Sequence, residues 1–156
     1  MQHREPPATH RERLATYRER LWPAWWVFVA TALAIPASLL VFLPISVIAG
    51  YVVAAALYGA IVVTLLVTTP VVEVAEGTLR AGRARIERRF IGAVTAHTGA
   101  EAFAERGTRL DARAWLLLRP WLSGVVRVEL TDPDDPTPYW LVSTRRPDEL
   151  AAALNP

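Results

Sequence analysis

The chain divides sharply into one long apolar segment and two flanking segments in which polar and apolar residues mix. From Leu21 to Val72 there is no Asp, Glu, Lys, Arg or His. A helix of a soluble protein rarely exceeds about 20 residues and keeps a polar face, which this segment lacks. A helix needs roughly 20 residues to cross a bilayer, so the segment is long enough for two spans. We therefore expect a transmembrane hairpin over residues 21–70.

Proline and short polar residues divide this hairpin into two helices. The pattern predicts a first helix over about 23–43 and a second over about 46–69. Pro23 suits a first helical turn, where the missing N–H costs nothing. Pro36 lies inside the first helix, where a simple kink is favoured over a functional hinge. Three tryptophans at the start of the hairpin are predicted interfacial anchors: Trp22, Trp25 and Trp26.

Arginine flanks the hairpin on both sides and is absent from the connection between the helices. Five Arg and three Glu precede Leu21, in residues 1–20, which we expect to be a flexible basic tail. Five more arginines follow the second helix: Arg80, Arg83, Arg85, Arg88 and Arg89. Positive residues remain on the cytoplasmic side of a membrane. The sequence therefore predicts a multi-pass protein of the cell (plasma) membrane with both termini in the cytoplasm.

A cleaved signal peptide is the competing interpretation of the first apolar helix. The basic start and the small residues at 31–34 would suit one, but the apolar run far exceeds the roughly 7–15 residues of such a segment. The spans contain no ionisable residue, so a proton relay or ion pathway of the usual kind is not expected. Stripes of small residues in both helices would allow close packing within the hairpin or between copies. The sequence therefore allows a homo-oligomer. We interpret the hairpin as a membrane anchor.

Residues 71–156 change to short alternating segments that predict a β-rich domain. The predicted strands are 71–76, 78–82, 83–87, 90–97, 114–118, 125–130 and 139–143, with short helices at 101–105 and 147–154. The run of Asp and Pro at 132–138 predicts a rigid turn. An antiparallel sheet needs one covered face, and the last helix is the candidate cover. This order of elements resembles a small pleckstrin-homology-like domain, giving a membrane α+β fold class overall.

Five short motifs carry a family resemblance. They are Tyr-Arg-Glu-Arg-Leu-Trp at 17–22, Gly-Thr-Leu-Arg-Ala-Gly-Arg at 77–83, Leu-Arg-Pro-Trp at 118–121, the turn and strand at 132–140, and Ser-Thr-Arg-Arg-Pro at 143–147. Through them the chain resembles the actinobacterial membrane proteins grouped as domain of unknown function 3093. The resemblance covers nearly the whole chain after the tail. It implies a two-span hairpin with a cytoplasmic domain and brings no catalytic residue with it.

Composition and motifs argue against most enzyme classes. The chain has no Cys, and the region after Val72 balances twelve Arg against twelve acids, unlike the basic footprint of a nucleic-acid binder. His97 has no partner at catalytic spacing, and no phosphate loop or zinc spacing occurs. Asp132, Asp134 and Asp135 could bind a cation, but a structural turn is favoured. We therefore predict no catalytic, cofactor-binding or metal-binding residue and no enzyme activity.

The predicted contact residues are the five arginines after the hairpin together with Arg119 and Trp121. Basic residues near an anionic leaflet each contribute about 1 kcal/mol to binding, although topology alone would also produce such a cluster. The leading hypothesis is a non-enzymatic membrane-anchored binding or scaffolding module that contacts lipid head groups, an unidentified membrane protein, or both. The alternative is an accessory subunit of a lipid or envelope enzyme or of a transport complex. A pocket that joins His97 or the acidic turn to arginine would favour the enzyme alternative.

Overall fold

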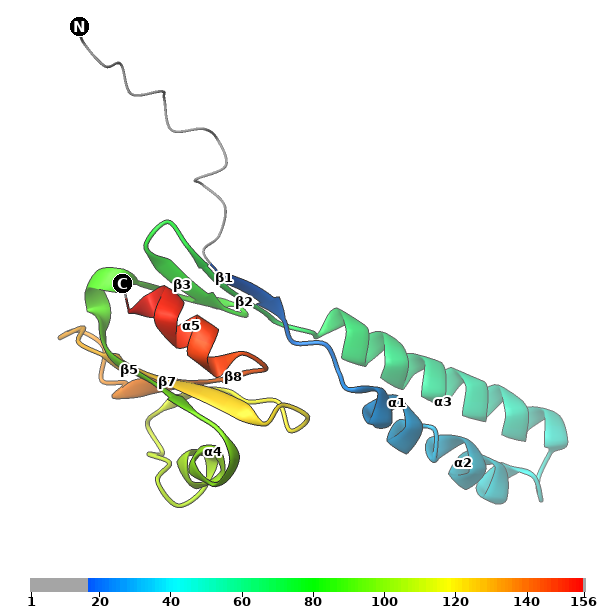
Figure 1. Cartoon of the computed structure of the whole chain (residues 1–156). Helices are drawn as coiled ribbons and strands as arrows, with labels where there is room; N and C mark the ends of the chain where they lie inside the picture. Colours follow the sequence, from blue (N-terminus) through cyan, green and yellow to red (C-terminus); the bar gives the residue numbers. More distant parts are fainter. Residues whose placement is uncertain (1–16, 156) are drawn as a thin grey trace, which may run out of the picture. The chain divides into compact units, whose positions relative to one another are not determined.

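The computed structural model describes residues 17–155 and divides the chain into two units. One unit is Leu21–Pro70, and the other combines residues 17–20 with residues 71–155. Figure 1 shows that the first unit is helical and that the second contains all of the strands. We call the second unit the β-domain.

The helical unit contains α1 (Trp25–Thr31), α2 (Ala34–Phe42) and α3 (Val47–Val67). The Ser46 hydroxyl caps α3 by accepting a hydrogen bond from the amide of Ala49 at 3.3 Å. Two segments, residues 25–42 and α3, are long and apolar enough to cross a membrane. Only 11% of each of these windows is buried. The helices therefore expose most of their apolar surface instead of forming the core of a soluble fold.

The first helical segment is interrupted at Ala32 and Leu33, one turn before Pro36. Pro36 has no N–H, so the carbonyl of Ala32 lacks its donor four residues later. That carbonyl instead accepts from the amide of Ile35 at 3.0 Å, which tightens the chain locally. Pro36 therefore breaks the helix as a proline kink does. The helix begins at Trp25, two residues after the Pro23 start that the sequence predicts.

One four-stranded antiparallel sheet, sheet A, has the order β1-β2-β3-β4. Its strands are β1 (Tyr17–Arg20), β2 (Val71–Ala75), β3 (Thr78–Ala81) and β4 (Ala84–Glu87). Strand β1 corrects the prediction of a flexible tail up to Arg20, while residues 1–16 of that tail lie outside the described residues. The side chains of β1 alternate between buried and exposed, but one of the two buried ones is Glu19. This hidden carboxylate removes the apolar alternation by which a strand is normally recognised.

The second sheet, sheet B, has the order β5-β7-β8-β6. Its strands are β5 (Ile91–His97), β6 (Trp115–Leu117), β7 (Gly124–Leu130) and β8 (Tyr139–Thr144). The short 3₁₀ helix η1 (Arg88–Phe90) leads from sheet A into β5. Strand β6 pairs with β8 in parallel, so the prediction of one purely antiparallel sheet is wrong. Strand β6 pairs with β8 and not with β7, which follows it in the chain. The local alternation of residues does not show which distant strand is the partner.

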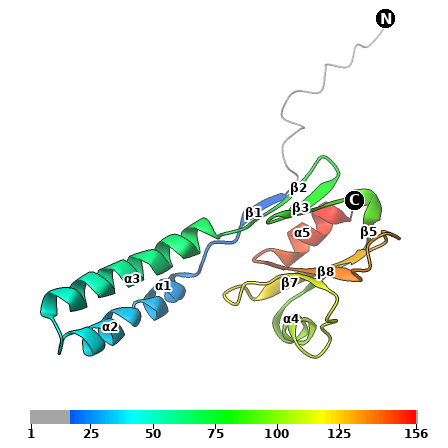
Figure 2. The ribbon, with the colours of Figure 1, turned by 180° about the vertical axis from the view of Figure 1, so that it is seen from behind.

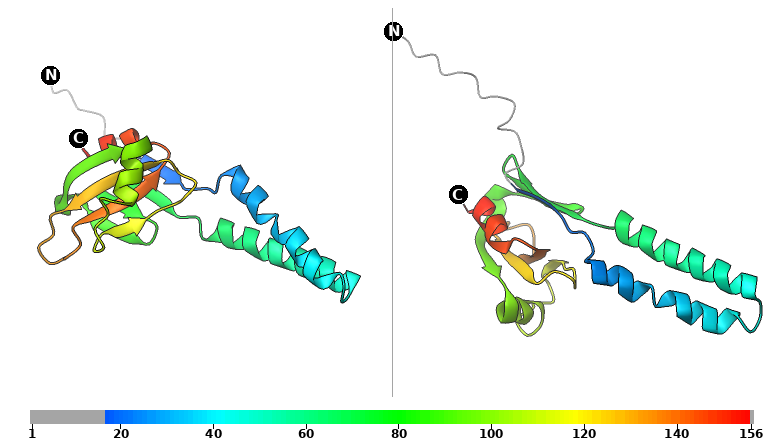
Figure 3. Two further views of the ribbon diagram at one scale, coloured as in Figure 1. Left: turned by 90° about the horizontal axis from the view of Figure 1, so that it is seen from below. Right: turned by 45° about the vertical axis from the view of Figure 1, so that its right-hand side comes forward.

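Two helices cover the two faces of sheet B. Helix α5 (Pro147–Leu154) lies between the two sheets, as Figure 2 shows, and buries Leu150 and Leu154. Helix α4 (Gly99–Arg106) lies on the opposite face of sheet B, which the views in Figure 3 confirm. There Ala102 packs with Val125 and Leu141. The predicted role of the last helix as a cover is therefore confirmed, and α4 covers a second face.

Candidate functional site

The outer face of sheet A carries a row of charged side chains that belong to four neighbouring strands. The register places Arg18, Glu73, Arg80 and Arg85 directly opposite one another in turn. The three arginines are exposed and Glu73 is partly buried. We call these four residues the arginine row. Like charges directly opposite each other destabilise a sheet, so the pairing of Arg80 with Arg85 has a cost that an external anion would offset.

The five arginines predicted as one contact cluster have different environments. Two belong to the arginine row, and Arg83 occupies the exposed turn between β3 and β4. Arg88 instead donates to the carbonyl of Leu154 at 2.6 Å, at the C-terminus of α5, where a cation is favourable. Arg89 pairs with Glu87 at 2.9 Å. The Arg88 side chain is therefore engaged at the end of α5, because η1 interrupts the strand alternation and turns it toward the helix. Its role as a contact residue stays a prediction.

The other predicted contact pair, Arg119 and Trp121, lies in the loop between β6 and β7 of sheet B. The guanidinium of Arg119 lies over the Trp121 ring, 5.7 Å from its centroid. The amide of Arg119 donates to the hydroxyl of Ser143 at 3.0 Å, which fixes the loop against the end of β8. Both side chains are partly buried. The structure thus places this pair on a different sheet from the arginine row.

The remaining tryptophans lie in both units. Trp140 is buried and packs on the partly buried Trp115, with ring centroids 4.4 Å apart. In the helical unit Trp22, Trp25 and Trp26 are exposed. Their role as interfacial anchors stays a prediction.

A buried carboxylate that the sequence analysis missed fastens β1 to the end of β8. Glu19 is 7% exposed, and its Oε2 accepts hydrogen bonds of 2.5 Å from the hydroxyls of Tyr17 and Thr144. Its Oε1 accepts from the amide of Arg145 at 3.1 Å. Burial, and then the hydrogen bond to Glu19, raises the pKa of Tyr17 well above its ordinary value. The phenol therefore stays protonated and donates to the carboxylate.

A second buried carboxylate joins α4 to sheet B. Glu105 is 4% exposed and lies 3.2 Å from the guanidinium of Arg127 and 3.4 Å from that of Arg109. The Arg127 guanidinium also lies over the Tyr139 ring, 3.9 Å from its centroid. These contacts pair the buried charge of Glu105 with two arginines and hold α4 on the sheet, so its role is structural. The sequence alone does not distinguish Glu105 from an exposed acid of a helix, because its partner Arg127 lies on a distant strand.

A cavity of about 420 Å³ opens between the end of sheet A and the 132–138 turn. Its polar and aromatic lining includes Arg85, Glu87, Phe90, Asp132, Asp135 and Trp140. It therefore joins the acidic turn to an arginine, which is one of the two arrangements that would favour the enzyme alternative. His97 lies elsewhere, with its ring 3.0 Å from the hydroxyl of Thr95.

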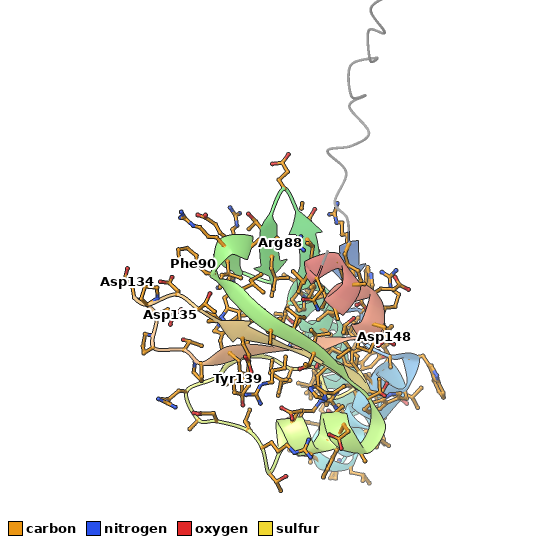
Figure 4. All side chains as sticks on the ribbon, turned by 60° about the vertical axis from the view of Figure 1, so that its left-hand side comes forward. Arg88, Phe90, Asp134, Asp135, Tyr139 and Asp148 are labelled. Carbon is orange, nitrogen blue, oxygen red and sulfur yellow. The ribbon has the colours of Figure 1, made fainter. Side chains whose placement is uncertain are left out.

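Local hydrogen bonds hold the acids of the 132–138 turn. Hydrogen bonds from Thr137 hold the pKa of Asp135 below its ordinary value, so Asp135 is ionised at neutral pH. Asp132 accepts from the amide of Asp134 at 3.0 Å, as an ordinary Asx turn does. Figure 4 shows Asp134 and Asp135 on the same side of the domain as Phe90. Within residues 17–155 no three His, Asp or Glu side chains are grouped to hold a metal ion.

These features define a class of protein in which two apolar helices, suited by length and composition to span a membrane, are inserted between the first two strands of a two-sheet domain. The chain belongs to the family described as "Protein of unknown function (DUF3093)", whose model matches residues 16–154. No curated protein and no solved structure matches the chain.

Proposed function

We propose that the chain is a non-enzymatic, membrane-anchored binding or scaffolding module. In this proposal the hairpin crosses the cell membrane twice and holds the β-domain, a pleckstrin-homology-like module, at the cytoplasmic face. The observation that carries the proposal is the insertion of the hairpin between two paired strands. Arg20 pairs with Val71, and the amide of Leu21 donates to the carbonyl of Pro70 at 3.0 Å. The chain therefore leaves and re-enters the β-domain at one point, as two spans require.

The exposure of the helices supports membrane insertion. Trp25, Leu40 and Ile48 are 77%, 78% and 78% exposed. Soluble proteins rarely expose continuous apolar surfaces of this extent, and such surfaces mark contact with a membrane or a partner. A bilayer would cover the apolar side chains along both helices, and neither span carries a charge that it would have to desolvate.

Strand β1 argues against the signal-peptide interpretation. Cleavage after the first helix would remove Tyr17–Arg20 from the β-domain, although β1 pairs with β2 along its whole length. It would also separate the carboxylate of Glu19 from the buried hydroxyl of Thr144 and the amide of Arg145. An uncleaved anchor keeps this edge of sheet A intact.

The arginine row supports a binding role for the domain. Arg80 and Arg85 are exposed and directly opposite each other, and arginine presents a planar fork of donors that matches carboxylate or phosphate groups. An acidic segment of a membrane protein partner would relieve the repulsion between them. The balanced total charge of the domain is compatible with such a local contact, because the contact depends on one face.

Co-purification from native membranes tests the binding role. A double variant with Arg80→Ala and Arg85→Ala should lose a partner that the wild-type chain enriches reproducibly, because its anion-binding face is gone. Arg113→Ala is the matched control, since Arg113 is an exposed arginine paired with Asp111 at 3.0 Å in sheet B's flanking loop. Equal recovery of the partner with both variants, or recovery of the chain alone, would contradict the proposal.

The cavity beside Arg85 favours a second candidate, an accessory subunit of a lipid or envelope enzyme or of a transport complex. In that case the co-purified partner is an enzyme or transporter. Its activity in membranes should fall when the chain is deleted and return with the wild-type chain. Unchanged activity would remove this candidate.

A further inference from the structure

The two ends of the β-domain carry opposite charge, and the covalent structure fixes which end adjoins the hairpin. Strand β1 ends at Arg20 and β2 begins at Val71, and these residues pair with each other. We call this the hairpin end of the domain. The turn at Glu76 and Gly77, at the other end of β2, belongs to the far end.

The register brings a turn of sheet A to the hairpin end. The amide of Gly82 donates to the carbonyl of Val71 at 2.8 Å, so the β3–β4 turn lies beside the start of β2. Arg83 occupies the second position of this turn and is exposed. Gly82 has a φ of +60°, which allows the tight turn that presents Arg83. Arg20 and Arg83 are therefore both at the hairpin end.

Sheet B contributes further arginines to the same end. The guanidinium of Arg145 lies 3.4 Å from the carbonyl of Arg20, which places the end of β8 beside the end of β1. Thr144 pairs with Gly124, so the loop that carries Arg119 and Trp121 also ends here. The hairpin end thus gathers a group of arginines from both sheets: Arg20, Arg83, Arg119 and Arg145. The guanidinium of Arg146 instead reaches back along β1, where it donates to the carbonyl of Arg18 at 3.2 Å.

Three acids lie at the hairpin end, and two of them are paired. Glu19 is buried and lies 3.5 Å from the guanidinium of Arg145. Glu149, in the first turn of α5, pairs with Arg146 at 2.8 Å. Asp148 is the third. Apart from the pair of Arg146 and Glu149, which lies along β1, four arginines against two acids leave this end positive.

The far end has the opposite balance. The amide of Thr131 donates to the carbonyl of Phe90 at 2.8 Å, which places the acidic turn beside η1 and the end of β4. Three arginines, Arg85, Arg88 and Arg89, face five acids at this end: Glu76, Glu87, Asp132, Asp134 and Asp135. Figure 4 shows Asp134 and Asp135 on the opposite side of the domain from Asp148. The β-domain is therefore electrically polarised along its strands.

We infer that the hairpin end binds anionic phospholipid head groups of the leaflet in which the hairpin is anchored. The inference rests on the proposed membrane anchorage. Four residues join β1 to α1 and three join α3 to β2. Because each step along the chain spans at most about 3.6 Å, Arg20 lies within about 18 Å of the start of α1 and Val71 within about 14 Å of the end of α3. Head-group charges act over a Debye length of about 8 Å. Arg83 and Arg119 supply the cations, and Trp121 supplies an aromatic ring that favours the interface.

The polarity distinguishes a lipid surface from a small anion as the ligand. A bilayer that carries negative charge attracts the arginines of the hairpin end and repels the acids of the far end, so both ends favour one orientation. Each arginine near such a surface contributes about fivefold in affinity, which corresponds to about 1 kcal/mol. The polarised domain thereby holds the arginine row at a defined angle to the membrane and available to a partner.

The test uses the full-length chain in nanodiscs of phosphatidylcholine with increasing phosphatidylglycerol. Because the chain has no Cys, a polarity-sensitive bimane can be attached to the single-cysteine variant Ser123→Cys in the loop at the hairpin end. Asp134→Cys places the same label at the far end. Phosphatidylglycerol should shift the emission of the Ser123→Cys label to the blue and leave the Asp134→Cys label unchanged, and about 1 M salt should reverse the shift.

A charge variant and its matched control complete the test. Arg83→Gln should raise the phosphatidylglycerol content needed for half of the shift about fivefold. Arg89→Gln removes an arginine that is also exposed, at the far end, and should leave that content unchanged. No shift, equal shifts at both labels, or equal effects of both variants would overturn the inference. Release of the chain from the bilayer by alkaline carbonate would instead overturn the membrane anchorage, so the two failures are distinguishable.

Discussion

Removal of the Glu19 carboxylate should detach β1 from the β-domain. Glu19→Ala deletes the acceptor of the Tyr17 and Thr144 hydroxyls and of the Arg145 amide, at 2.5, 2.5 and 3.1 Å. Hydrogen bonds to a charged group contribute about 1.5–3 kcal/mol each, and the buried donors left behind keep their desolvation cost. The removal of one partner from a buried charged network costs about 3–5 kcal/mol in total.

Thermal unfolding of the detergent-solubilised full chain measures this effect. Near-UV circular dichroism follows the tertiary environment of the buried Trp140. For a domain of this size about 1 kcal/mol lowers Tm by about 4–8 °C, so Glu19→Ala should lower it by more than about 12 °C. Glu19→Gln keeps one acceptor oxygen and should show a smaller loss.

Hydrogen exchange identifies the segment that opens. The amides of Tyr17–Arg20 and of β2 should lose protection in Glu19→Ala, while those of β7 keep theirs at low temperature. Glu129→Ala is the matched control, because Glu129 is exposed and lies 3.9 Å from the Arg127 guanidinium, and it should change stability by less than about 0.5 kcal/mol. If Glu19→Ala behaves like this control, the carboxylate does not fasten β1.

Three further predictions concern the same domain. Arg88→Ala should lower the free energy of unfolding by about 1–2 kcal/mol, since it removes a charged cap at 2.6 Å from the end of α5. Arg89→Ala should lower it by less than about 0.5 kcal/mol. Equal Tm values for the two variants would contradict the different roles of Arg88 and Arg89. Because the pKa of Tyr17 is raised in the folded state, its protonated phenol stabilises the fold fully below pH 10.0, and this contribution is lost as the pH rises further. Tyr17→Phe should therefore abolish part of the loss of stability at alkaline pH. An unchanged dependence of stability on pH would contradict this role. Gly124→Ala would place a Cβ 2.9 Å from a backbone oxygen of β8 and should cost about 1–3 kcal/mol; a wild-type Tm would refute the close approach.

The hairpin and most strands could be predicted because their signals are local. The absence of charge from Leu21 to Val72 and the cap at Ser46 determine α3 to within a few residues. Alternation of apolar and polar residues likewise predicts β2 and β5, and the apolar run that follows the 132–138 turn predicts β8. Pro36 indicates the break between α1 and α2 through its missing donor.

The features that could not be predicted depend on contacts between distant residues. Strand β1 is recognisable only from its partner β2, about 50 residues later in the chain, and its inward Glu19 is satisfied by Thr144. The parallel pairing of β6 with β8 is another choice between distant segments. Arg88 changes from a surface cation to a helix cap because η1 reorients it. The charge polarity of the domain is similarly visible only after the register is known.

Cysteine labelling of intact cells tests most directly whether the hairpin spans the membrane. Since the chain has no native Cys, a single cysteine can be placed at Ile45, between α2 and α3, or at Asp134, in the β-domain. A membrane-impermeant maleimide should label Ile45→Cys on intact cells and Asp134→Cys only after permeabilisation. Labelling of Asp134→Cys on intact cells, or protection of Ile45→Cys until the membrane is opened, would contradict a two-span anchor with a cytoplasmic domain.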